Sequence, residues 1–87
     1  MGLDTVELLM EIEEEFNIKI SDEDAAGLGV LGDLSRHVVK MAADQRQIDI
    51  KFEVVLRKII DILVSNYGIP REKINSMSHV VDDLGLD

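Results

Sequence analysis

The first segment of the chain constrains the fold most strongly, because its apolar residues recur with the period of an α-helix. Between residues 3 and 16 they follow one another at spacings of three and four, with glutamates at most of the positions between them. The stripe consists of Thr5, Leu8, Leu9, Ile12 and Phe16. The sequence therefore predicts an amphipathic helix over residues 3–16, with Asp4 as its N-cap and Glu7 completing a capping box.

The opposite face of this predicted helix is acidic. Glu7 and Glu11 place like charges four residues apart, as do Glu11 and Glu15, and each such pair costs about 0.2–0.5 kcal/mol. The segment contains no Lys or Arg to offset these charges. Two interpretations are open at this point: the acids form a solvated face, or they form a docking face for basic partners.

The remaining apolar periodicity also indicates helices, and no segment alternates in the way that is typical of strands. Further helices are predicted over residues 22–26, 30–43 and 52–67. The last of these has the longest apolar stripe, with Gly68 as the residue that follows its C-terminal end, and is expected at the centre of the core. Residues 44–47 are polar and form either a loop or a continuation of the helix before them. The fold class predicted is all-α.

Length and composition define the class of protein. With 87 residues and 46% hydrophobic residues, the chain forms one small domain with a modest core. It has no Cys, and its net charge of −9 argues against nucleic acid and anionic membranes as partners. Neither a membrane-spanning run nor a signal peptide is visible, so a soluble, cytoplasmic protein is expected.

Residues with catalytic or metal-binding chemistry do not form a recognisable motif. His37 and His79 are far apart and lack metal-ligand spacing, so both are interpreted as structural or solvent-facing. Residues 22–27 have acids at the first and third positions of a calcium loop, but not the other ligands, so weak surface binding of cations is the most they predict. Phosphate loops and nucleophile elbows are also missing. We expect no enzymatic activity and no metal site.

Two segments resemble parts of acyl carrier proteins. Residues 3–8, Leu-Asp-Thr-Val-Glu-Leu, and residues 13–16, Glu-Glu-Glu-Phe, are similar to the acidic second helix of that family, which partner enzymes recognise. Residues 74–87, which end in Asp-Asp-Leu-Gly-Leu-Asp, resemble the loop that leads into that helix and ends in Asp-Leu-Gly-x-Asp-Ser-Leu. The resemblance implies a family that holds acyl thioesters for fatty-acid or polyketide-type synthesis.

The order of these segments is reversed relative to the family. Residues 3–43 resemble the second to fourth family helices, and residues 50–87 resemble the first helix and the loop after it. The chain therefore looks like a single domain, residues 1–87, that is circularly permuted at the start of the family's second helix. Permutation is physically reasonable because the ends of a single domain often lie close together. We expect a small four-helix bundle of acyl-carrier-protein type with permuted connectivity.

The apparent break falls at the family's attachment site. In the family, the Ser after Asp-Leu-Gly-x-Asp carries 4′-phosphopantetheine, but here the sequence reaches Asp87, and Gly2 stands beside Leu3 where that Ser aligns. Glycine has no hydroxyl group to modify. Ser35 lies inside a predicted helix and is interpreted as an ordinary helix residue. We therefore expect no attachment residue and no cofactor in this chain.

The resemblance also implies where partners bind. The predicted recognition residues are Asp4, Glu7, Glu11, Glu13, Glu14 and Glu15. Expected partners are basic surfaces of acyl-transfer or fatty-acid and polyketide synthesis enzymes, and the chain is expected as a monomer or a segment-exchanged dimer. The function predicted is a carrier or interaction domain. The alternatives are an unmodified acidic interaction module and a permuted or truncated form of a functional acyl carrier protein.

Overall fold

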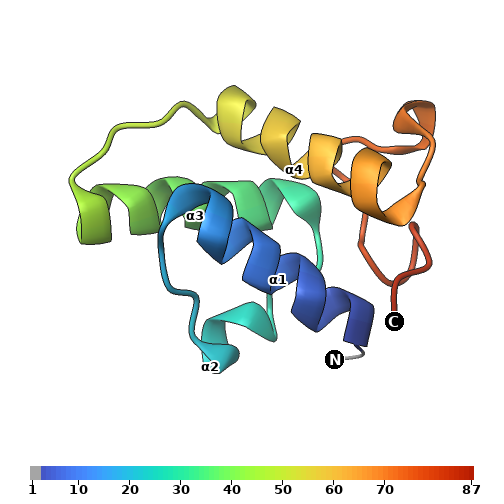
Figure 1. The fold of residues 1–87 in the computed structure, drawn as a ribbon, viewed down its shortest axis with the longest axis horizontal. Helices are drawn as coiled ribbons and strands as arrows, with labels where there is room; N and C mark the ends of the chain where they lie inside the picture. Colours follow the sequence, from blue (N-terminus) through green and yellow to red (C-terminus); the bar gives the residue numbers. More distant parts are fainter. Residues whose placement is uncertain (1–2) are drawn as a thin grey trace.

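The protein forms a small bundle of four helices, which the computed structural model describes for residues 3–87 (Figure 1). The helices are α1 (Leu3–Phe16), α2 (Asp22–Ala25), α3 (Leu31–Arg46) and α4 (Phe52–Tyr67), followed by a 3-10 turn, η1 (Arg71–Lys73). Residues 3–87 contain no β-strand, although Val30 and His79 form one isolated antiparallel bridge. The prediction of an all-α bundle is confirmed.

The two longest helices form the frame of the bundle. α3 and α4 run antiparallel and are joined by an extended connector, while α1 crosses in front of α3 and lies below α4 in the view of Figure 1. Val55, Ile59 and Leu63 recur every fourth residue along α4 and are completely buried. They meet buried residues of α3 and α1, so the stripe predicted for the fourth helix does lie in the core. From α1 and α3 the core receives Leu8, Ile12, Phe16, Leu31, Leu34, Val38 and Ala42.

Three helices end at a residue with left-handed backbone angles. These residues are Asn17 after α1, Gln47 after α3 and Gly68 after α4, with φ values of 54°, 53° and 67°. Gly68 was expected in this role. Of the two possibilities for residues 44–47, the structure has helix as far as Arg46, after which the left-handed conformation of Gln47 ends α3.

The first turn of α1 differs from the prediction. The helix already includes Leu3, so Asp4 is a residue of the first turn and not the N-cap. The predicted capping box at Asp4 and Glu7 is therefore wrong. α2 has a side-chain N-cap, because the Ser21 hydroxyl oxygen accepts a hydrogen bond from the Asp24 backbone amide at 3.2 Å. No helix within residues 3–87 is long and apolar enough to cross a membrane.

Candidate functional site

The start of α1 lies against the far end of the sequence. The backbone N–H of Thr5 donates a hydrogen bond to the carbonyl oxygen of Asp87 at 3.1 Å, and the Thr5 hydroxyl donates to the same oxygen. This carbonyl supplies an acceptor for an N-terminal amide of α1, which has no partner within the helix. Gly2 lies outside the described residues. We refer to the contact between Thr5 and Asp87 as the junction.

Residues 79–87 are folded into a compact turn that leads to the junction. The backbone N–H of Leu86 donates to the carbonyl oxygen of Val80 at 2.9 Å, and both side chains are buried. Gly85 has a φ of 76°, a conformation that glycine adopts without a steric penalty. The buried side chains and the turn hydrogen bond together hold Asp87 beside α1.

His79 organises the beginning of this turn. Its Nδ1 accepts hydrogen bonds from the backbone N–H groups of Val81 and Asp82, at 3.1 and 3.2 Å, while the backbone N–H of His79 donates to the Asp83 carboxylate at 2.7 Å. The imidazole ring packs so tightly on Gly29 that a Cβ atom there would lie 2.1 Å from Nε2. His79 therefore has a structural role, in agreement with its interpretation from the sequence.

The loop before the turn is attached to the start of α3. The backbone N–H groups of Leu31 and Gly32 donate to the carbonyl oxygens of Ser78 and Ser76, at 3.0 and 2.8 Å. Free amides at the N-terminus of α3 thereby find acceptors in a segment that is distant in sequence. This attachment fixes the loop, and through it the junction, relative to the bundle.

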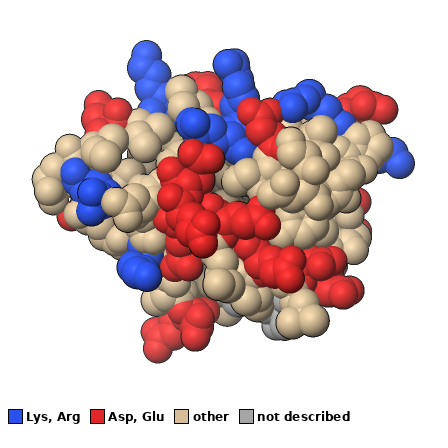
Figure 2. All heavy atoms as spheres, viewed as in Figure 1, with Lys and Arg blue, Asp and Glu red and all other residues tan. Residues whose placement is uncertain are grey.

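A band of acidic side chains covers the exposed face of α1. Figure 2 shows Asp and Glu side chains in a band across the middle of the molecule, where Figure 1 has α1, and Lys and Arg side chains mostly around the periphery. Glu7 and Glu14 are exposed, and neither makes an ion pair or a side-chain hydrogen bond with any residue in the range 3–87. Their carboxylates are free to meet a partner.

The other acids predicted for recognition differ in their surroundings. Glu11 accepts a hydrogen bond from the Asn66 side chain at 2.8 Å, and Glu15 lies 3.8 Å from the ammonium group of Lys58. The absence of basic residues within α1 therefore does not leave all of its acids unpaired, because α4 supplies Lys58. Asp4 is half-buried, and its backbone carbonyl oxygen lies 3.4 Å from the Tyr67 hydroxyl.

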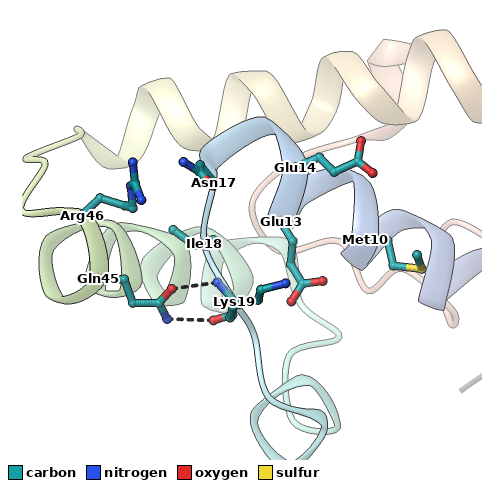
Figure 3. A pocket seen from close by; sticks show the side chains of 8 residues that line it. All are labelled: Met10, Glu13, Glu14, Asn17, Ile18, Lys19, Gln45 and Arg46. Carbon is teal, nitrogen blue, oxygen red and sulfur yellow. Dashed lines mark hydrogen bonds between the residues drawn. The ribbon is translucent and has the colours of Figure 1, made fainter.

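Glu13 lies on a different side of α1 from Glu7. One of its carboxylate oxygens accepts a hydrogen bond from the Ile20 backbone N–H at 2.7 Å. It lines a hollow of about 430 Å³ at the end of α1, together with Met10, Glu14, Asn17, Ile18, Lys19, Gln45 and Arg46 (Figure 3). There the Gln45 side chain pairs with the backbone N–H and carbonyl of Lys19, at 2.7 and 2.9 Å. Glu13 thus helps to fix the segment after α1.

Apolar side chains are exposed among the acids of α1. Leu3, Val6 and Met10 have exposed fractions of 78%, 40% and 54%. At 100° per residue they lie on the side of the helix opposite the buried stripe, next to Glu7 and Glu14. The exposed face of α1 therefore combines apolar contact area with free negative charge.

A small apolar cavity of about 110 Å³ lies behind α1, close to the junction. It is lined by Thr5, Leu8, Leu9, Ala25, Ala26, Leu28, Gly29, Leu34, His79, Val80 and Val81. Because α1, α2, α3 and the turn after His79 all contribute to its wall, the cavity forms only where the two ends of the chain meet. Apart from the apolar stripes, no feature of the sequence indicates the position of this cavity.

Residues considered from the sequence for other chemistry have structural surroundings. His37 is half-buried, with Nε2 3.6 Å from a carboxylate oxygen of Asp24 on α2. Ser35 is completely buried within α3 and so is not accessible for modification. Within residues 3–87, His, Asp and Glu side chains do not form a group of three that could hold a metal ion.

A family model matches the first part of the chain. The family model described as "Phosphopantetheine attachment site" matches residues 3–38. Acyl carrier proteins of Chlorobium phaeovibrioides and Chlorobium luteolum are each 50% identical over 39 residues, which are 45% of this chain and 50% of each relative. Residues 3–38 are therefore similar to acyl carrier proteins.

An acyl carrier protein of Wolinella succinogenes is also 50% identical, over 37 residues that cover 42% of this chain and 49% of the relative. The chain thus spans about half the length of the acyl carrier proteins that it matches. No solved structure is significantly similar to the chain. Within α1, the matched region includes the exposed acidic face and the residue at the junction, Thr5.

Proposed function

We propose that this chain is a carrier or interaction domain of acyl-carrier-protein type in permuted order, which acts in fatty-acid or polyketide-type biosynthesis. The junction is the observation that carries the proposal. Residues 3–43 and residues 50–87 each resemble one part of the family fold, and a backbone hydrogen bond of 3.1 Å joins Thr5 to Asp87 where these parts would be continuous. The relationship of residues 3–38 to acyl carrier proteins adds support for the first part.

The exposed face of α1 is the proposed docking surface. Glu7 and Glu14 carry free negative charge beside the exposed side chains of Leu3, Val6 and Met10. A basic partner with an apolar centre complements both properties: the charges speed up association, and the apolar contacts slow dissociation. Asp4, Glu11 and Glu15 extend the negative field of this surface, whereas the contact of Glu13 with Ile20 favours a structural role for that residue.

The apolar cavity favours the carrier function over a purely docking one. It lies next to Thr5, near the position at which the family carries its acyl arm, and aliphatic side chains form most of its wall. We propose that it accommodates the start of an acyl chain. The sequence has Gly2 at the position that aligns with the attachment Ser, so residues 1–87 themselves are proposed to accept no 4′-phosphopantetheine.

Incubation with a phosphopantetheinyl transferase and coenzyme A tests the permuted arrangement. Residues 1–87 are compared with a variant that has Ser-Leu added after Asp87 and a control with Ala-Leu added there. We expect intact-mass spectrometry to show the arm on the Ser-Leu variant alone. An arm on the unextended chain would disprove the proposed lack of an acceptor. If the Ser-Leu variant folds but remains unmodified, the carrier function fails, and the acidic interaction module remains as the alternative.

A further inference from the structure

We propose that two copies of this chain exchange their C-terminal halves through residues 47–51, so that α3 and α4 become one continuous helix in each copy. The proposal does not depend on the carrier function, because it rests on how the two halves of the fold are connected. The occupant of the exchanged position is a second copy of this chain.

The two halves, residues 3–46 and residues 52–87, complete each other. The buried residues of α4, such as Ile59, pack against those of α1 and α3, such as Ile12 and Val38, so neither half encloses its own core. Polar contacts join them at several separate places, including Glu11 with Asn66, Leu31 with Ser78 and Thr5 with Asp87. An exchanged dimer re-forms all of these contacts between copies, and so it loses none of their stabilisation.

The connector contributes little to the monomer apart from Ile50, which is half-buried against the core. Residues 47–49 are exposed, and the large apolar side chain of Ile48 has an exposed fraction of 44%. Its backbone hydrogen bonds include one from the Gln47 N–H to the Ala43 carbonyl oxygen and one from the Ile48 N–H to the Ala42 carbonyl oxygen, both at 3.1 Å. Both acceptors belong to the last turns of α3. Straightening the connector therefore breaks few interactions.

The connector also contains the one strained position that straightening relieves. Gln47 has a φ of 53°, a left-handed conformation that costs an L-residue other than Gly, Asn or Asp roughly 1–2 kcal/mol. The other turns at helix ends use Asn17 and Gly68, which tolerate it better. Between Gly32 and Gly68 the sequence has neither glycine nor proline, so it is compatible with an uninterrupted helix.

Matched variants at Gln47 test the role of the turn. Gln47→Gly removes the steric penalty of the monomer turn, and Gln47→Ala keeps the penalty while favouring helix. Each protein is unfolded in denaturant, refolded at low and at high concentration, and measured by size-exclusion chromatography with light scattering. We expect dimers after refolding at high concentration, with Gln47→Gly lowering the association constant about tenfold per connector and Gln47→Ala raising it.

A distance measurement distinguishes exchange from simple face-to-face association. Because the chain has no Cys, Asp33→Cys and Ser65→Cys introduce two unique sites for spin labels. In the monomer, the start of α3 and the end of α4 lie toward the same end of the molecule (Figure 1). The longest dimension of the whole molecule is 33 Å. In a continuous helix the two Cα atoms of one chain are about 48 Å apart. Doubly labelled chains are refolded with an excess of unlabelled chains, so that only distances within one chain contribute.

We expect the dimer fraction to contain chains whose two labels are near this long distance apart. The monomer fraction should contain no such chains. The proposal is overturned if dimers form while the labels keep the short distance of the monomer, because the copies then associate without exchange. It is also overturned if wild type and Gln47→Ala both refold as monomers at high concentration. In each case the function proposed above is unaffected.

Discussion

The hydroxyl group of Tyr67, the last residue of α4, lies 3.4 Å from a carboxylate oxygen of Glu11 on α1. Burial of the phenol, followed by the negative charge of Glu11, raises the pKa of Tyr67 from 10.0 to about 12. A raised pKa means that the folded protein holds the phenolic proton more tightly than the unfolded chain. This contribution to stability is present below pH 10 and is lost as the pH rises from 10 to about 12.

Glu11→Gln should lower the pKa of Tyr67, because it removes the nearest negative charge. The chain has one Tyr and no Trp, so ultraviolet absorbance follows this single phenol during an alkaline titration. Asp33→Asn on α3 removes a charge elsewhere and should leave the titration unchanged. Equal midpoints for Glu11→Gln and wild type would show that the charge of Glu11 does not act on the phenol.

Charge reversal on the exposed face of α1 tests the proposed docking surface. Glu7→Lys with Glu14→Lys should slow association with a basic acyl-transfer enzyme, and added salt should slow association of the wild type, because exposed charges are screened beyond about 8–10 Å. Surface plasmon resonance at low and high salt measures both effects. The matched control, Glu53→Lys with Glu72→Lys, changes the net charge equally at exposed sites outside α1.

The fold of both double variants is expected to persist, since they replace exposed side chains. The association rate should fall clearly more for the α1 variant than for its control. If the two variants slow association equally, net charge alone governs the encounter. If neither does, the acids of α1 are simply solvated.

Glu13 and Glu14 are neighbours with different surroundings, so alanine at each position should have different effects. Glu13→Ala removes the acceptor of the Ile20 N–H and should lower the free energy of unfolding by about 1–3 kcal/mol. Glu14→Ala should change it by less than about 0.5 kcal/mol, because no residue in the described range bonds to its carboxylate. Urea denaturation gives both values. If Glu13→Ala leaves the free energy of unfolding unchanged, the structural role of Glu13 is contradicted, and its predicted role in partner recognition stands.

The different surroundings of Glu13 and Glu14 show how far the sequence could predict the candidate site. Helical periodicity correctly separates the buried stripe containing Ile12 from the acids, because side-chain direction in a helix depends on local geometry. It cannot indicate that Glu13 bonds to Ile20 or that Lys58 approaches Glu15, since these contacts depend on packing between elements. The end of α3 was equally hard to predict, because a left-handed Gln47 has no signature in the sequence.

The packing of His79 on Gly29 predicts an asymmetry between two glycines of the same loop. Gly29→Ala would place Cβ 2.1 Å from Nε2 of His79, whose ring is held by two backbone hydrogen bonds, so it should cost about 1–3 kcal/mol of stability. For Gly27→Ala the nearest atom to the new Cβ is the Asp24 carbonyl oxygen at 3.9 Å, so this control should be nearly neutral. Thermal unfolding measured by circular dichroism compares them, and equal melting temperatures would contradict the packing argument.

The junction also has a consequence for how the chain reaches its native state. Thr5 and Asp87 are separated by 82 residues, and the core residues of α1 and α3 require Val55, Ile59 and Leu63 of α4. During synthesis, α1 therefore leaves the ribosome long before its neighbours in the core exist. Contacts of such large sequence separation slow folding, because the loop between them must close before they form. Pausing translation ahead of the α4 codons should accordingly leave the nascent chain sensitive to proteases and dependent on chaperones.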